Sequence, residues 1–505
     1  MAFGRESREL SDVSPGKTPE PIVENVSENA DRESYDREQL ARLGKKSVLK
    51  RNFRFLTILG FSCAILVTWE GTLMNFAPGL ANGGPGGLIY GFIFVWIGNI
   101  SVFSTLCTSA AAAFLTGTMI QGLVTFMIPS YNAKTWQGTL MLWMCILIAV
   151  FINTLVSSML PKLEGMILIL HIVGFFAVLI TLVSFGANGD ASSVFLEFRN
   201  EGMWPTQGLS WFVGLLGCVF SFAGVDCSFH MCEEVQNPSL AVPRSIMTSV
   251  LINGAMGFAM IIAMLYGATD IDKAINSPTG YPYIEIFYQA TGSKGGTAVM
   301  TSLIIVMTLS AIVGVIAATS RMFWAFARDR GLPFWSTLSK VDSRTNVPVW
   351  AITITSLISC LIGLINIGSA VVYNAIISVA ISGLYSSYIM AASLLLYRRC
   401  GKGYKMPDPS ALPALADVTA GEGQALAWGP WHIPGLLGTI NNTFACLFMI
   451  VIWFFSFWPP QTPVAPDTMN YASLMTGGVA LLSTIYYLLA ANKVYKGPLM
   501  EIQAN

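Results

Sequence analysis

The stretch Phe55-Leu-Thr-Ile-Leu-Gly-Phe-Ser-Cys-Ala-Ile-Leu-Val-Thr-Trp-Glu-Gly71 reads as the start of a membrane-spanning helix that carries an acid. It opens the apolar run 55–80, and about 20 apolar residues suffice to cross the hydrocarbon core of a bilayer. Glu70 stands inside this run, where an ionisable side chain is costly and marks a transport pathway or a paired partner. The alternative is that Glu70 lies near the outer interface or pairs with a polar neighbour. Gly71 beside it permits the helix to unwind.

Similar apolar runs recur along most of the chain and indicate its class. Of its 505 residues, 54% are hydrophobic and only 11% are charged, whereas a soluble domain has roughly 25% charged residues. The composition therefore predicts an all-α integral membrane protein, and a formal net charge of zero gives no basic face for nucleic acid. The runs lie near 55–80, 86–129, 137–158, 163–186, 208–232, 246–267, 294–320, 348–367, 370–396, 434–458 and 470–491.

The distribution of Lys and Arg predicts which loops face the cytoplasm, because basic residues are enriched on that side of a membrane. Basic clusters lie at 42–54, 321–344 and 398–405. All three fall on one side only if the uncharged run 86–129 contributes two spans. The chain is then predicted to have about twelve transmembrane helices, with both termini cytoplasmic. This count requires an unusually tight hairpin near Cys107–Ala110.

The two ends of the chain are expected to flank one membrane domain. Residues 1–52 are polar, with an acidic and Ser-rich first half, and predict a disordered cytoplasmic tail rather than a cleavable signal peptide. The transmembrane domain is assigned to residues 53–492. Residues 493–505 are assigned to a short cytoplasmic C-terminal tail.

A second stretch, Phe220-Ser-Phe-Ala-Gly-Val-Asp-Cys-Ser-Phe-His230, repeats the combination of a glycine with an acid. Gly224 and Asp226 place a flexible point and a charge in the middle of the sixth span. Paired interruptions in the first and sixth helices are typical of transporters built from two inverted five-helix repeats. Trp69 and Phe222 lie beside these points, and aromatic faces attract ammonium groups. Ordinary packing is the alternative for each aromatic residue.

Three further segments carry structural expectations. The Gly-rich string 82–87 is expected to form a short external loop between two spans. Pro238 and Pro243 are expected to stop the sixth helix, at a cytoplasmic corner where Glu233, Glu234 and Arg244 can pair. The segment 320–333 is basic and amphipathic, and it is expected to lie at the inner membrane interface.

No motif indicates a catalytic or metal centre. Cys227, His230 and Cys232 come close to a metal-ligand spacing, but structural packing is the favoured interpretation on a membrane-embedded helix. The other two histidines, His171 and His432, have no nucleophile or metal constellation around them. An enzyme is therefore the least supported class, and no cofactor or metal is expected.

Five strings carry a resemblance to a known family: 60–71 (GFSCAILVTWEG), 160–176 (LPKLEGMILILHIVGFF), 233–244 (EEVQNPSLAVPR), 277–293 (SPTGYPYIEIFYQATGS) and 320–333 (SRMFWAFARDRGLP). The chain resembles the fungal amino acid/choline branch of the amino acid–polyamine–organocation permeases, which includes choline and γ-aminobutyrate permeases. The resemblance runs from about residue 50 to 495.

The resemblance implies a leucine-transporter-type fold, with inverted five-helix repeats plus two extra helices, and a secondary transporter coupled to a proton gradient. It places the substrate site between the stretches 65–71 and 220–226, and it implies a plasma-membrane location. The candidate substrate-binding residues are Val67, Thr68, Trp69, Glu70, Gly71, Phe220, Phe222, Gly224 and Asp226.

The chain departs from the family between its second and third spans. Members of the family that it resembles usually continue span 2 into an acidic, Gly-rich cytoplasmic loop before span 3 begins. This loop has a pattern like Pro-Thr-Ser-Gly-Gly-Gln-Tyr-His-Trp. Here Thr105-Leu-Cys-Thr108 runs directly into Ser109-Ala-Ala-Ala-Ala. The cytoplasmic end of span 2, the loop and the start of span 3 are therefore expected to be missing, which accounts for the tight hairpin.

These features favour a permease for choline, γ-aminobutyrate or another amino acid, in which Glu70 and Asp226 each serve as proton carrier or as ammonium partner. A buried carboxylate has the raised proton affinity that a proton carrier needs. Two alternatives remain: a non-transporting nutrient sensor, and an inactive truncated variant of such a permease. Besides a small amine or amino acid, the lipid bilayer is the expected partner.

Overall fold

The computed structural model describes residues 40, 45–102, 109–186, 189–368, 372–401, 431–466, 468–499 and 501. This described part is helical, and its β contacts amount to one isolated parallel bridge between Phe53 and Val235. Ten of its helices are long and apolar enough to cross a membrane. Two more apolar helices, within α5 (Ser109–Met127) and α9 (Gln207–Phe220), are shorter. The predicted all-α membrane protein of about twelve spans is therefore confirmed.

The other helices of the bundle follow the apolar runs of the sequence. They are α2 (Phe55–Leu66), α3 (Thr68–Met74), α4 (Phe76–Ser101), α6 (Thr135–Leu155), α7 (Leu160–Phe185), α10 (Cys227–His230), α11 (Pro238–Gly267), α14 (Lys294–Arg328), α16 (Val349–Gly363), α17 (Ile365–Gly368), α18 (Val372–Gly401), α19 (Gly435–Phe455) and α20 (Ala472–Tyr486). Shorter elements are η1 (Ser157–Met159), α8 (Ala191–Leu196), η2 (Cys232–Glu234), α12 (Ile271–Ile275), α13 (Pro282–Thr291), α15 (Trp335–Leu338), η4 (Tyr487–Ala491) and α21 (Asn492–Val494).

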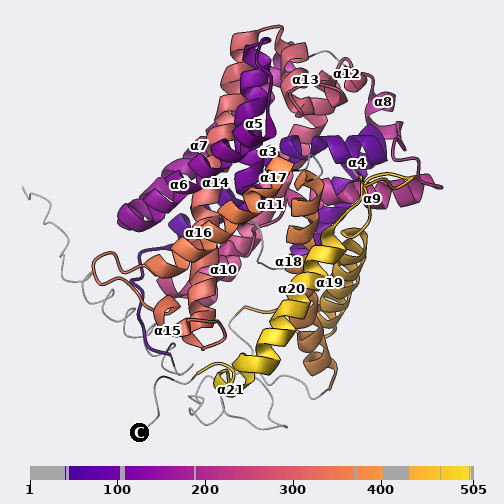
Figure 1. The fold of residues 1–505 in the computed structure, drawn as a ribbon. Coiled ribbons are helices and arrows are strands. Elements are labelled where there is room, and N and C mark those ends of the chain that lie inside the picture. Colours follow the sequence, from indigo (N-terminus) through magenta and orange to yellow (C-terminus); the bar gives the residue numbers. More distant parts are fainter. Residues whose placement is uncertain are drawn as a thin grey trace, which may run out of the picture.

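The bundle has two distinct ends. The short helices α8, α12 and α13 gather at one end, and α15 and α21 lie at the other, near the C-terminus (Figure 1). The described terminal segments also contact this second end, which we call the tail end: Lys45 pairs with Asp329, and Glu501 pairs with Arg328. Helices α18, α19 and α20 lie side by side along one flank.

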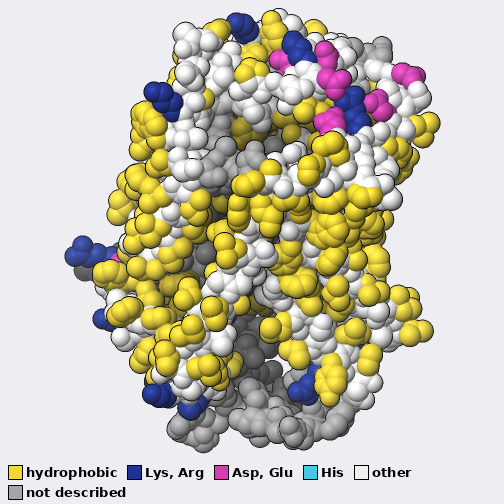
Figure 2. Space-filling model, turned by 45° about the vertical axis from the view of Figure 1, so that its right-hand side comes forward, with side chains coloured by type: hydrophobic (Ala, Val, Ile, Leu, Met, Phe, Trp, Pro, Cys, Tyr) yellow, Lys and Arg dark blue, Asp and Glu magenta, His cyan; other side chains and the backbone are white. Residues whose placement is uncertain are grey.

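A hydrophobic surface surrounds the middle of the bundle. Figure 2 shows apolar side chains across the middle of one face, while charged side chains lie mainly toward its two ends. On α6, for example, Leu147, Phe151 and Leu155 are all more than half exposed. In hydrocarbon, helices satisfy every backbone hydrogen bond internally, so a belt of exposed apolar side chains on helices suits a lipid environment.

The Gly-rich string 82–87 does not form the expected external loop. It lies inside α4, where helical geometry continues on both sides of a single kink at Gly84, with φ of 70° and ψ of −176°. Only glycine adopts such angles readily, so the helix can kink at this single residue. The backbone of Gly84 and Gly86 packs against Phe195–Arg199, next to α8. This close packing leaves no room for a longer loop.

Pro238 and Pro243 do not stop the sixth helix as expected. Pro238 is the first residue of α11, and Pro243 lies inside that helix. A proline at the first position loses nothing, because the first N–H groups of a helix have no intrahelical acceptor. Pro243 lies one turn further on, where it removes a single hydrogen bond near the helix start.

Two other expectations at the tail end are also corrected. The segment after Ser320 does not follow span 8 as a separate element, because α14 continues without a break to Arg328. Its place at the inner membrane interface stays a prediction. Glu233 and Glu234 form ion pairs with Arg328 and Arg321 of this extension rather than with Arg244.

The run 86–129 does contribute two helices, α4 and α5, as the charge pattern predicted. The connection between them falls largely outside the described residues, which resume at Ser109. The expected tight hairpin near Cys107–Ala110 therefore stays a prediction.

Candidate functional site

The first span is broken at Val67, between α2 and α3. Val67 has φ of 36° and ψ of 45°, which is the left-handed region. A β-branched residue is strained there, and such strain persists only where the surroundings enforce it. The helix resumes at Thr68, and Gly71 lies inside α3 rather than at the break. The sequence therefore predicted the interruption but placed its flexible point four residues too late.

The sixth span is broken between α9, which ends at Phe220, and α10, which begins at Cys227. Gly224 lies in the connecting turn with φ of 98°. A Cβ at this position would lie 2.9 Å from Cγ2 of Ile65, two residues before the first break. A Cβ on Gly71 would likewise lie 3.3 Å from Cα of Ser221. The two interruptions therefore pack directly against each other, as inverted-repeat transporters require.

Replacing Gly224 with alanine is expected to destabilise this contact between the two breaks. A side chain at positive φ costs about 1–2 kcal/mol, and the new methyl group would also collide with Ile65. We expect a lower midpoint of thermal unfolding in detergent. Gly208→Ala is the matched control, because a Cβ there meets nothing within 4 Å. Equal midpoints for the two variants would contradict the strain at Gly224.

A small cavity of about 30 Å³ lies between the two breaks. A cavity needs roughly 10–15 Å³ to hold one water molecule, so this space is far too small for an organic solute in the present conformation. Of the predicted site residues, Val67, Gly71 and Phe220 line it. The other lining residues are Ile65, Leu66, Met74, Leu115, Ala223, Thr308, Ala311 and Val315, which come from α2, α3, α5, α14 and the turn after α9.

Glu70 points away from this cavity, into a fully buried polar cluster. Its Oε1 lies 2.9 Å from Nδ1 of His171 on α7. The indole N–H of Trp69 donates to the same Nδ1 over 3.2 Å, and Nε2 of His171 lies 3.0 Å from Oδ1 of Asn253 on α11. All four residues are fully buried. Helices α3, α7 and α11 are thus joined through one imidazole.

The chemistry of Nδ1 gives this cluster two protonation arrangements. When Nδ1 of His171 carries a proton, it donates to the carboxylate of Glu70. When Nδ1 is unprotonated, its lone pair accepts the indole N–H of Trp69. The two partners of Nδ1 therefore suit different protonation states of the same ring. An acid and an imidazole that exchange one proton without solvent have the composition of a proton-binding site.

Asp226 lies in a separate position, closer to the tail end. Its Oδ1 accepts the phenolic O–H of Tyr388 on α18 over 3.4 Å, and Oδ2 lies 3.1 Å from Nε2 of His230. Asp226 is only 2% exposed. The predicted carboxylates Glu70 and Asp226 therefore face different helices rather than one common pocket.

The remaining predicted site residues are packing residues in this conformation. The ring of Phe222 packs against Phe92 of α4, with centroids 5.2 Å apart. Thr68 is fully buried, and its backbone carbonyl accepts a hydrogen bond from Thr72. His171, Asn253 and Tyr388 were not among the predicted site residues. The signal for His171 was present, since it is an ionisable residue within the apolar run 163–186.

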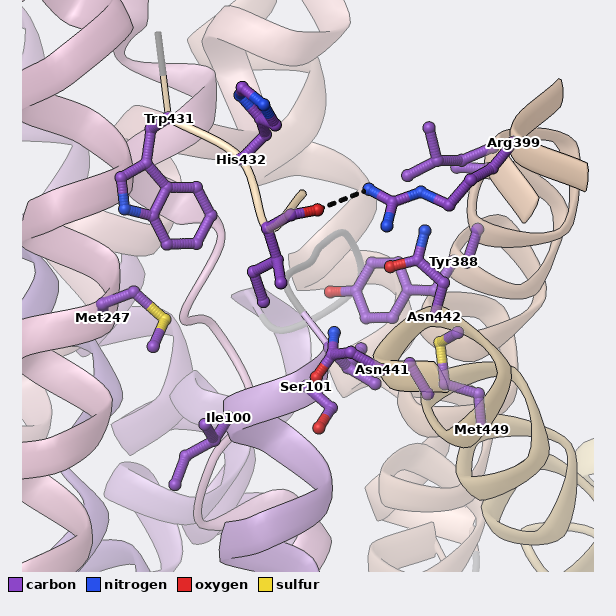
Figure 3. A pocket seen from close by; sticks show the side chains of 16 residues that line it. Ile100, Ser101, Met247, Tyr388, Arg399, Trp431, His432, Asn441, Asn442 and Met449 are labelled. Atoms are coloured by element: carbon purple, nitrogen blue, oxygen red, sulfur yellow. Dashed lines mark hydrogen bonds between the residues drawn. The ribbon is translucent and has the colours of Figure 1, made fainter. Parts of the chain in front are cut away.

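A larger cavity of about 410 Å³ lies beside Tyr388, among α4, α11, α18 and α19. Figure 3 shows Arg399 and Trp431 pointing toward it from opposite sides, and Ser101 at its edge, where α4 ends. Arg399 donates to the carbonyl of Ile433 over 3.1 Å. The described lining includes this guanidinium and no carboxylate.

The broken first and sixth helices, the apolar belt and the buried acids together define a polytopic membrane transporter. The profile of the amino acid permease family matches residues 55–481. The chain belongs to this family.

Its relatives are transporters of amines and amino acids. The choline transporter of Saccharomyces cerevisiae is 27% identical, over 88% of this chain and 83% of the yeast protein. A putative amino acid/polyamine transporter of Macrophomina phaseolina is 26% identical, over 82% of this chain and 97% of that protein. An amino-acid permease of Arabidopsis thaliana is 25% identical, over 92% and 96%.

The alignment with the yeast protein also shows a difference in length. It is 494 positions long, whereas the 88% of this 505-residue chain that it covers amounts to fewer residues, so the other positions are gaps in this chain. The yeast protein therefore contains residues that have no counterpart here.

Proposed function

We propose that this protein is a proton-coupled secondary transporter of a small amine-bearing solute, such as choline, γ-aminobutyrate or another amino acid. The observation that carries the proposal is the buried Glu70–His171 pair, three residues beyond the break at Val67. Membership of the amino acid permease family and a choline transporter among the relatives support the class of solute. In this proposal the plasma membrane is the location, and the tail end faces the cytoplasm.

The broken helices supply the elements that bind the solute. A backbone carbonyl near Val67 or Gly71 would face the ammonium group, and Phe220 would contact its apolar part. Since the cavity at these residues is only about 30 Å³, the structure corresponds to a closed, solute-free conformation. The cavity must widen on opening, and the α2–α3 break provides the hinge. No cofactor takes part, and the proton gradient supplies the free energy.

Uptake into yeast cells tests this proposal. A strain that lacks its own choline transporter is expected to accumulate labelled choline or γ-aminobutyrate when it expresses this chain, and a protonophore is expected to abolish the accumulation. The native yeast transporter is the positive control for choline. Specific binding of a solute without flux would contradict transport and indicate a sensor. Accumulation that survives the protonophore would contradict proton coupling.

The transcript must be sequenced across codons 100–120 before the uptake result is interpreted. Helix α4 ends at Ser101, beside the cavity of about 410 Å³, and the yeast relative has residues that this chain lacks. If a longer message dominates in the source cells, uptake should be measured with that longer protein. If the short message is the sole species, this 505-residue chain must itself support uptake.

A further inference from the structure

Glu164 on α7 is a further buried acid, besides Glu70 and Asp226, and the mechanism above does not use it. Its side chain is about 1% exposed, whereas Lys162, two residues earlier, faces outward. Glu164 and His171 are seven residues apart, which is about two helical turns, or roughly 10 Å along the axis. Both belong to the buried face of α7. One helix face therefore carries a titratable group at the proposed proton site and another nearer the tail end.

Neither carboxylate oxygen of Glu164 has a hydrogen-bond partner among the described residues. An ionised carboxylate in apolar surroundings without a partner is strongly unfavourable, so the side chain carries a proton in this conformation. The elements packed against α7 are α2, α11, α13, α14 and η1. Their charged and titratable residues, with the nearby N-cap residue of α2, are Arg54, Cys63, Arg244, Tyr266, Tyr283, Glu285, Tyr288, Lys294, Arg321 and Arg328. No ion pair joins any of them to Glu164.

Helix α2 closes over Glu164. A Cβ on Gly60 would lie only 3.0 Å from the backbone carbonyl oxygen of Glu164, so the two helices touch here with no side chain between them. One turn further along, Ala64 of α2, Ile167 of α7 and Met307 of α14 form a small apolar cluster. This contact excludes water from Glu164 as long as α2 stays in place.

The break at Val67 allows α2 to move separately from α3. The strained left-handed conformation of Val67 joins a tail-end segment, which covers Glu164, to α3, which carries Glu70. Since Gly60 has no side chain, nothing on α2 interlocks with α7 at the point where it contacts Glu164. Separation admits water to the carboxyl group from the tail end, and hydration favours its ionised form.

We propose that Glu164 is the group that releases the proton at the tail end, and this inference rests on the proposed proton-coupled transport. When α2 separates from α7, the Glu164 carboxylic acid gives its proton to water on that side. Before closure, the carboxylate takes one proton from the Glu70–His171 pair over water admitted between them. One proton thus enters the pair and one leaves Glu164 in each cycle, and only O–H and N–H bonds change.

The first test compares exchange with accumulation in proteoliposomes that contain the full chain. Coupling to one proton lets a gradient of about one pH unit support about tenfold accumulation, since each unit is worth 1.36 kcal/mol. We expect Glu164→Gln, which keeps the shape of the side chain, to exchange labelled for unlabelled solute but to lose that about tenfold accumulation. Lys162→Gln on the exposed face of the same helix is the control and should accumulate like the wild type. Wild-type accumulation by Glu164→Gln would overturn the proposal.

The second test does not depend on transport. A hydrophobic carbodiimide reacts with a protonated carboxyl group in an apolar site, and mass spectrometry can locate the adduct. We expect labelling of Glu164 in the wild type at neutral pH, and less labelling when conditions favour the conformation open to the tail end. Absence of the adduct would overturn the protonated state of Glu164. Failure of the wild type to couple solute to protons would instead refute the proposed function, whatever the labelling shows.

Discussion

Replacing Glu70 with glutamine is expected to reduce proton-driven uptake by about a hundredfold or more, the usual effect of removing a proton-transfer group. Glutamine has nearly the shape of glutamate, so the packing around Trp69 and His171 is retained. The amide cannot ionise, however, and Nδ1 of His171 then has no acid with which to exchange its proton. The variant is therefore expected to be folded and present in the membrane but unable to couple solute movement to the proton gradient.

The measurement is the pH profile of solute uptake for the wild type and Glu70→Gln at equal amounts of surface protein. Glu201→Gln is a suitable control, because Glu201 is exposed and its ion pair with Arg199 is long, at 3.5 Å. The control should retain both the rate and the profile. If Glu70→Gln keeps the wild-type pH dependence, Glu70 is not the proton carrier, even if the rate falls.

The apolar runs of the sequence, together with the distribution of Lys and Arg, were sufficient to predict about twelve spans, because a run of about 20 apolar residues has few alternatives to a membrane helix. Helix ends were less predictable. Span 8 was expected to stop before Arg321, yet α14 continues for eight more residues. The reason is that Arg321 is neutralised by Glu234, a partner 87 residues away in sequence. A hydropathy value calculated over neighbouring residues does not detect a pairing between residues so far apart in sequence.

The candidate site was likewise predictable from the sequence only in part. Glu70 was recognisable from the sequence as a charge in an apolar run, but its partner His171 lies 101 residues further along. Only the tertiary packing of the first span, whose α2 segment contacts α7, brings them together. The break at Val67 could not be located either, since Gly71 is the residue that tolerates unwinding more readily. A valine in the left-handed region is imposed by tertiary contacts, so local propensity points to the wrong residue.

Removing the guanidinium of Arg321 is expected to have the largest effect on stability. Nε of Arg321 donates to Oε1 of Glu234 over 2.8 Å, and the two side chains are only 2% and 8% exposed. Breaking a buried ion pair from one side typically costs about 3–5 kcal/mol, because the remaining charge is buried without compensation. Arg321→Met should therefore unfold at a clearly lower temperature in detergent. This pair also ties α14 to η2, next to the bridge between Phe53 and Val235.

A double-mutant cycle separates the burial of charge from the loss of packing. Arg321→Met combined with Glu234→Leu leaves no buried charge, and apolar replacements of buried pairs are often neutral. We therefore expect the double variant to be more stable than Arg321→Met alone. Lys340→Gln is the control, because Lys340 is exposed and its loss should not change the midpoint. A double variant no more stable than the single one would mean that Arg321 acts through its packing. The ion pair would then not be what holds the tail end of α14 against the sixth span.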